Sequence, residues 1–193
     1  QYAEKHQITE EQSSALLHEQ VSSNRGTLDW YSLDHWSERL EMDIPALTRE
    51  IQHMISLRPH TLDFLTQLHS SHRDVVMVTN AHRKTLEIKM GQIDITHWFD
   101  RVVVSHDLDS PKEEQAFWTK LQALHPFDPA RTLLIDDTEQ ILESARDYGI
   151  AHLLTLLQPD SKRQRRLDTR FPGIHHFDEI MPGISSPAGE QAS

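Results

Sequence analysis

The spacing of apolar residues along the chain changes near residue 73. Before this point apolar side chains recur at helical intervals, as in Leu33 and Trp36, which share one helical face. Thr9 begins a capping-box pattern ahead of another helical stretch. Because no strand-like run occurs in this part, residues 1–56 are predicted to form a helical domain.

Beyond residue 73, short β-branched runs alternate with helical patterns. The runs fall at 74–78, 101–105, 131–135 and 152–157, with helices expected around 84–90, 113–124 and 139–148. This alternation predicts an α/β fold, in which a parallel, Rossmann-like sheet carries helices on both faces. We therefore expect an α/β core over 57–184 and a disordered tail over 185–193.

Composition narrows the range of partners. The 193 residues carry a formal net charge of -11, which disfavours binding to a nucleic acid polymer. No apolar run reaches the length of a membrane span, so no membrane partner is expected. The chain has no cysteine, which suits a reducing compartment, and we expect a cytoplasmic protein. A basic cluster at 161–166 is interpreted as solvated surface.

Polar residues follow three of the predicted strands at the point where each ends. Thr79 and Asn80 follow the first, Lys112 follows the second through a loop, and Asp136 and Asp137 end the third. Because the carboxyl ends of parallel strands share one edge of a sheet, these side chains are expected to converge. That edge would then hold a hydroxyl, an amide, an ammonium and two carboxylates.

This set of side chains suits the transfer of a phosphoryl group. Lys112 can neutralise phosphate oxygens, and Thr79 can hold a phosphate together with a backbone N–H at a helix start. Adjacent carboxylates suit Mg²⁺, whose charge offsets their repulsion. Each residue also has a structural explanation, because a turn, a surface lysine and a helix cap use the same residue types.

Together these motifs resemble those of the haloacid dehalogenase superfamily of phosphohydrolases. VVMVTNAH, SPKEE and LLIDDTEQILESARDYGI are similar to its second, third and fourth motifs, in the family's order. Receiver domains of two-component systems use similar residues, but there the acid pair comes first and the lysine last. The helical stretch TLDWYSLDHWSERLEMDI resembles the cap domain of members that hydrolyse purine nucleotides.

The resemblance implies a role for each matched residue. Thr79 would bind the transferring phosphoryl group, with Asn80 beside it, and Lys112 would stabilise the charge on phosphate and nucleophile. Asp137 would ligate Mg²⁺, and Asp136 would be a second ligand or a partner of the first.

The implied reaction is the hydrolysis of a purine nucleoside 5′-monophosphate, GMP or IMP, to nucleoside and phosphate through an aspartyl-phosphate. Tyr31 in the cap and His82 after the phosphate motif are candidates to contact this substrate, although His82 can equally be a histidine at a helix start. Many relatives carry a further acid four residues past the metal ligand, where this chain has Ile141.

The family's first motif, Asp-x-Asp after the first strand, has no match in this sequence. Its first acid is the nucleophile, and the candidates LDWY, LDHW and FDRV do not follow strands. The resemblance therefore implies a chain that begins inside the cap and lacks the middle strand of its sheet. Two neighbouring strands would then have unpaired edges, and the isolated chain would be marginally stable.

Two other functions remain open on these residues. The chain can be a catalytically inactive module that binds nucleotide or metal, or a phosphatase for another small phosphomonoester. A dehalogenase on the same fold is less favoured, because it needs no metal and the acid pair suggests one.

Overall fold

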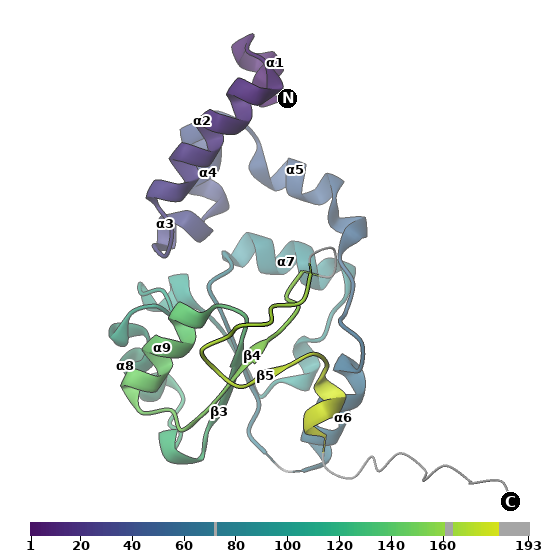
Figure 1. The fold of residues 1–193 in the computed structure, drawn as a ribbon, viewed down its shortest axis with the longest axis vertical. Helices are drawn as coiled ribbons and strands as arrows, with labels where there is room; N and C mark the ends of the chain where they lie inside the picture. The colour runs from purple at the N-terminus through teal and green to yellow at the C-terminus, as the bar shows by residue number, and fades with distance from the viewer. Residues whose placement is uncertain (72, 161–163, 182–193) are drawn as a thin grey trace, which may run out of the picture.

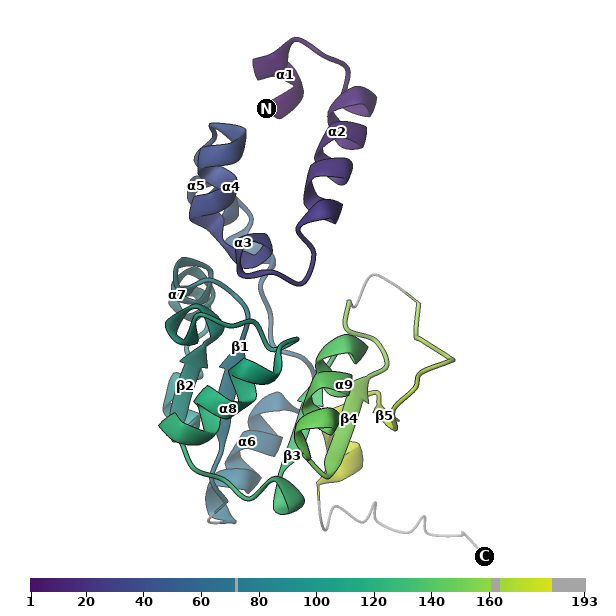
Figure 2. The same ribbon diagram turned by 90° about the vertical axis from the view of Figure 1, so that its left-hand side faces the viewer.

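The computed structural model describes residues 1–71, 73–160 and 164–181, and it consists of a helical part and an α/β part (Figure 1). The helical part stands at one end of the molecule, next to α7 of the other part (Figure 2). The tail predicted over 185–193 lies outside the described residues. Within the described ranges, no helix combines the length and apolar character that crossing a membrane requires.

Five helices and a 3-10 turn form the helical part. They are α1 (Tyr2–His6), α2 (Glu10–Ser23), α3 (Leu28–Tyr31), α4 (Leu33–Leu40), α5 (Ile44–Glu50) and η1 (Gln52–Met54). The capping box predicted at Thr9 is confirmed, because the Gln12 N–H donates to Thr9 Oγ1 at 3.2 Å and the Thr9 N–H donates to the Gln12 side chain. Trp36 on α4 is buried, and its Nε1 donates to the Trp30 carbonyl at 2.9 Å. Trp36 therefore belongs to the core of the helical part.

The α/β part contains the strands and helices that the alternating pattern predicts, together with further elements. In chain order, all its elements are α6 (Thr61–Ser70), β1 (Val76–Thr79), α7 (Arg83–Gln92), η2 (Thr96–Trp98), β2 (Arg101–Val104), η3 (Ser105–Leu108), α8 (Gln115–Leu124), η4 (Pro129–Arg131), β3 (Leu133–Asp136), α9 (Glu139–Tyr148), β4 (His152–Leu156), β5 (Gly173–Ile174) and η5 (Phe177–Ile180).

All strand pairs are parallel, as predicted, but the strands form two sheets rather than one. β1 pairs with β2, and β3, β4 and β5 pair in that order. In the described residues, β1, β2, β3 and β5 are each paired on one side only, because each stands at an end of its sheet. The expectation of two unpaired edges beside a missing middle strand remains a prediction. An unpaired edge leaves backbone donors and acceptors without partners in the sheet.

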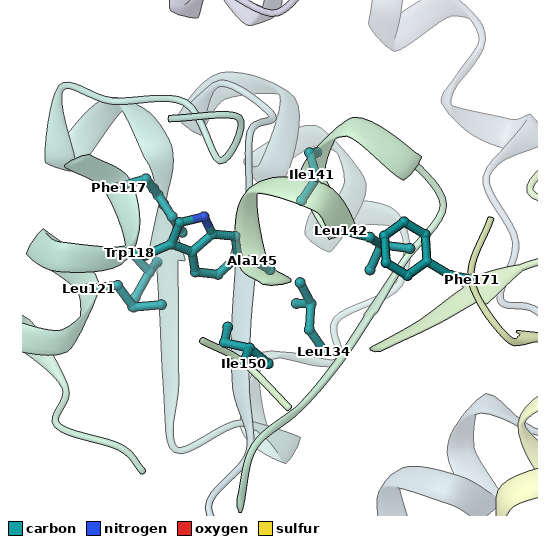
Figure 3. Packing of buried hydrophobic residues seen from close by; sticks show 10 residues of the cluster. Phe117, Trp118, Leu121, Leu134, Ile141, Leu142, Ala145, Ile150 and Phe171 are labelled. Atoms are coloured by element: carbon teal, nitrogen blue, oxygen red, sulfur yellow. The ribbon is translucent and has the colours of Figure 1, made fainter. Parts of the chain in front are cut away.

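The hydrophobic core lies where α8 and α9 pack on the strands. Figure 3 shows Phe117, Trp118 and Leu121 of α8 on the side of α9 that carries Ala145, with Leu134 of β3 below. On the other side of α9, Leu142 lies beside Phe171. Trp118 is buried in this cluster and carries one polar group, its indole N–H. That Nε1 donates to Ser144 Oγ at 2.9 Å. Since the two helices start next to the strand ends, this packing fixes the loops that precede them.

Replacing Ser144 by Ala is expected to lower the free energy of unfolding by about 1–3 kcal/mol, because the buried Trp118 N–H loses its acceptor. Urea unfolding measures the effect, with Ser56→Ala at an exposed site as the control. An equal, small effect of both substitutions would show that this hydrogen bond contributes little.

Candidate active site

Three of the predicted side chains meet at the carboxyl ends of the strands. Asn80 directly follows β1, Asp136 ends β3, and Lys112 lies in the loop between η3 and α8. The three residues are buried, with exposed fractions of 4% for Asn80, 6% for Lys112 and 8% for Asp136. The expectation that these strand ends converge is confirmed for these three side chains.

Hydrogen bonds join this trio into one network. The backbone N–H of Lys112 donates to Asn80 Oδ1 at 2.9 Å, and Lys112 Nζ lies 2.5 Å from Asp136 Oδ2. The other carboxylate oxygen of Asp136 accepts the Thr138 N–H at 2.9 Å. Both the ammonium and that N–H offset the charge of Asp136, which explains how an acid is tolerated at the end of a buried strand.

Thr79 and Asp137 lie next to the trio but have other partners. Thr79 Oγ1 accepts the Ala81 N–H at 3.0 Å, as in a turn. Asp137 is exposed, and its carboxylate accepts a long hydrogen bond of 3.4 Å from the Thr138 hydroxyl. Among the described residues, neither side chain has a hydrogen bond or ion pair with Lys112. Asp137 therefore presents its carboxylate to solvent.

The acid pair fits part of a magnesium site. In the described residues, no group of three or more histidine, cysteine or acidic side chains is placed to hold a metal ion. Mg²⁺, however, is commonly bound by one or two carboxylates together with water and substrate phosphate oxygens. The exposed carboxylate of Asp137, beside the buried one of Asp136, meets that requirement. Ile141 is buried in the core, so it contributes packing there.

Tyr31 and His82 lie where the helical part contacts the α/β part. The Tyr31 hydroxyl donates to Glu113 Oε1 at 2.6 Å, and burial together with this carboxylate raises the pKa of Tyr31. His82 Nε2 lies 3.9 Å from Asp34 Oδ2 of α4, and its ring centroid lies 5.0 Å from that of His106. Both residues are thus close to the strand ends but make contacts within the protein.

Two features of the site were missed by sequence reasoning. Glu113 had no assigned role, yet it contacts both Tyr31 and Asn80. Arg166 belongs to the basic cluster interpreted as solvated surface. It is exposed, but its Nη1 donates to the Asp137 carbonyl at 2.7 Å. Residues 161–163 of that cluster lie outside the described residues.

Sequence reasoning also missed an Asp-x-Asp sequence outside the site, Asp107 to Asp109, which lies at the end of the 3-10 turn η3 that follows β2. Asp107 forms an ion pair with Arg83. Asp109 has a left-handed backbone, with φ of 44°. The structure thus gives these two acids roles in an ion pair and a turn.

Burial, followed by the nearby His106, lowers the pKa of His82, so that the neutral ring is favoured in the folded protein. Asp34 and Glu87 act in the opposite direction, and Lys84 in the same direction as burial. In the described part of the chain, Nδ1 of His82 and of His106 are buried without a hydrogen-bond partner.

A lowered pKa means that the unfolded chain binds a proton more readily than the folded protein below pH 6.5, the ordinary value for histidine. The contribution of His82 to stability is therefore expected to be present above pH 6.5 and to be lost as the pH falls toward the folded pKa. Urea unfolding gives the free energy of unfolding at each pH between about 7.5 and about 5. The slope of this free energy against pH should be smaller for His82→Gln than for wild type. The matched change His53→Gln, at an exposed position, is expected to leave the slope unchanged, and equal slopes for wild type and His82→Gln would contradict the assignment.

The fold and the polar strand ends are those of a haloacid dehalogenase-like hydrolase, and the chain belongs to this family. The family's sequence model matches residues 3–155. The chain is similar to the GMP/IMP nucleotidase YrfG of Escherichia coli, with 32% identity over 180 residues that cover 93% of this chain and 81% of the relative. The same protein from Shigella flexneri matches equally.

Solved structures support the fold. A haloacid dehalogenase phosphatase from Thermococcus onnurineus has a TM-score of 0.76 at 15% identity, over 93% of this chain and 82% of that one. The putative hydrolase YfnB from Bacillus subtilis, whose structure was determined with bound magnesium, has a TM-score of 0.65 at 17% identity, over 93% and 86% of the two chains.

Proposed function

We propose that this protein is a magnesium-dependent phosphatase that hydrolyses purine nucleoside 5′-monophosphates, with GMP and IMP as substrates. The observation that carries the proposal is the buried trio of Asn80, Lys112 and Asp136 beside the exposed Asp137. The 32% identity to a GMP/IMP nucleotidase supports the choice of substrate.

Each strand-end residue has a role in this proposal. Thr79 and Asn80 hold the phosphoryl group at the end of β1, next to the start of α7. Lys112 stabilises the negative charge that develops on the phosphate oxygens. Asp137, with Asp136 beside it, holds Mg²⁺, which when bound supplies further positive charge to the phosphate. The roles assigned here are binding and charge stabilisation, and none of these residues is assigned as the nucleophile.

The helical part, residues 1–56, is proposed to act as a cap over the core at 57–184. Tyr31 and His82 lie at the contact between the two parts, where the nucleoside of a bound substrate would be enclosed. Closure of a cap excludes water from the site and strengthens the electrostatic interactions within it. The magnesium-bound YfnB structure is described as revealing interdomain movement, which supports a mobile arrangement of this kind.

A substrate panel tests the proposal. Release of inorganic phosphate from GMP, IMP, AMP and ribose 5-phosphate would be measured with Mg²⁺ and after its removal by EDTA. The highest kcat/KM is expected for GMP and IMP, and only with Mg²⁺. Equal rates for all four compounds would contradict purine selectivity, and full activity in EDTA would contradict the metal assignment.

A second candidate is a catalytically inactive module that binds nucleotide or Mg²⁺. It is favoured by one observation, the lack of the family's first motif among the assigned strand-end residues. The panel applied to this chain, and to a product extended through any coding sequence upstream of Gln1, separates the two functions. Nucleotide binding without phosphate release by either product would favour the inactive module.

A further inference from the structure

We propose that Glu113 is a positioning residue that couples the helical part to the loop carrying Lys112. Glu113 lies next to Lys112 in the chain but contacts two other elements, α3 and the end of β1. Its influence on turnover rests on the proposed function, whereas its influence on structure does not.

Both carboxylate oxygens of Glu113 accept a hydrogen bond. Oε1 accepts the Tyr31 hydroxyl at 2.6 Å, and Oε2 accepts Asn80 Nδ2 at 2.8 Å. The first bond joins residues 82 positions apart and crosses from the helical part to the core. Glu113 is partly buried, and hydrogen bonds to an ionised carboxylate are stronger than those between neutral groups. This side chain therefore links the two parts through a single group.

The bond to Asn80 also fixes the position of Lys112. A carboxylate only accepts hydrogen bonds, so Glu113 holds the NH₂ side of the Asn80 amide and leaves its oxygen facing the other way. That oxygen accepts the Lys112 N–H at 2.9 Å, and Lys112 Nζ in turn lies 2.5 Å from Asp136. The chain of contacts from Tyr31 to Asp136 is thus continuous, and Glu113 stands in its middle.

Neighbouring contacts show that the two parts touch in this region, in addition to their contact at α7. His106 Nε2 lies 3.0 Å from the Leu28 carbonyl, just before Tyr31 in the chain. Gly26 has a φ of +82°, and a Cβ at this position would lie 4.0 Å from Glu113 Cγ. The segment from Gly26 to Tyr31 therefore packs against the core beside Glu113. A shift of that segment would alter its contacts with the Glu113 carboxylate.

Amide hydrogen exchange at Lys112 reports the coupling directly, because this N–H is bonded to Asn80. Tyr31→Phe removes one hydroxyl from the helical part, which is bonded to Glu113 and also interacts with the Asn80 side chain, and leaves Lys112 itself unaltered. If Glu113 couples the two parts, the exchange rate of the Lys112 amide is expected to rise roughly threefold in Tyr31→Phe and roughly tenfold or more in Glu113→Ala. Glu114→Ala, which removes the same charge at the next, exposed position, is expected to change it less than about twofold.

Glu113→Gln provides a rescue. Its carbonyl oxygen can accept the Asn80 N–H while its amide nitrogen donates to the Tyr31 oxygen, so exchange at Lys112 should return to within about threefold of wild type. Kinetics on GMP give a second readout. Glu113→Ala is expected to lower kcat because Lys112 loses its alignment, whereas Tyr31→Phe is expected mainly to raise KM.

The outcomes separate this inference from the proposed function. Raised exchange at Lys112 in both Tyr31→Phe and Glu113→Ala, but not in Glu114→Ala, supports the coupling even if no nucleotide is hydrolysed. Unchanged exchange in Tyr31→Phe overturns it, even in an active enzyme. Equal effects of Glu113→Ala and Glu114→Ala would also overturn it, because charge alone would then explain the result.

Discussion

Replacing Lys112 by Met is expected to lower the free energy of unfolding by about 3–5 kcal/mol, because it leaves a buried carboxylate without its cation. The Lys112 and Asp136 side chains are only 8% and 7% exposed, and their charged atoms lie 2.5 Å apart. Taking one partner away does not return the other to water, so Asp136 keeps the cost of burial and loses the compensating charge. A loss of this size is a large fraction of the stability of a typical domain.

Two further variants make this prediction specific. Lys89→Met, the same change at an exposed position of α7, is expected to alter stability by less than about 0.5 kcal/mol. The double variant Lys112→Met with Asp136→Leu should recover much of the loss, because a buried ion pair can often be replaced by apolar residues. Urea unfolding measures all of them. A Lys112→Met protein as stable as wild type would show that the ion pair does not form in solution.

Replacing Asp137 by Asn is expected to reduce phosphate release from GMP and IMP by at least about 10²-fold, because a direct metal ligand should matter no less than the outer-shell groups that cost 10–100-fold. The exposed carboxylate of Asp137 is the acid of the pair that is not held by Lys112. Its removal takes a negative charge from the proposed Mg²⁺ site and leaves the core packing intact. Calorimetric titration with Mg²⁺ is expected to show a matching loss of affinity.

Asp147→Asn is the matched control for this substitution. It makes the same charge change on the exposed side of α9, where Asp147 contacts Arg146 rather than the strand ends. Activity should be within about twofold of wild type, as for most surface substitutions. An Asp137→Asn enzyme that retains both its rate and its Mg²⁺ affinity would remove Asp137 from the metal site.

Much of the α/β part could be predicted because its signals are local. The helix over Glu139–Tyr148 was predicted at its observed bounds, since an acidic first turn marks its start and Gly149, with φ of 111°, ends it. β5 was missed because two residues, Gly173 and Ile174, are too few to show a period. The division into two sheets depends on which strands pair, which no local pattern specifies.

The candidate site was predicted in part for the same reason. Asn80, Lys112 and Asp136 were found because each follows or ends a strand-like run, and parallel strands bring such ends together. Glu113 was missed because its partner, Tyr31, is 82 positions away on a short helix. Arg166 was missed because nothing in a run of basic residues indicates which of them contacts the acid pair.

The most direct test of the proposed activity is the time course of inorganic phosphate release from GMP and IMP by the complete gene product with Mg²⁺. The account predicts continuous release that stops on addition of EDTA and resumes when Mg²⁺ is restored. No release from either nucleotide under these conditions, with the protein folded, would contradict the proposed phosphatase activity.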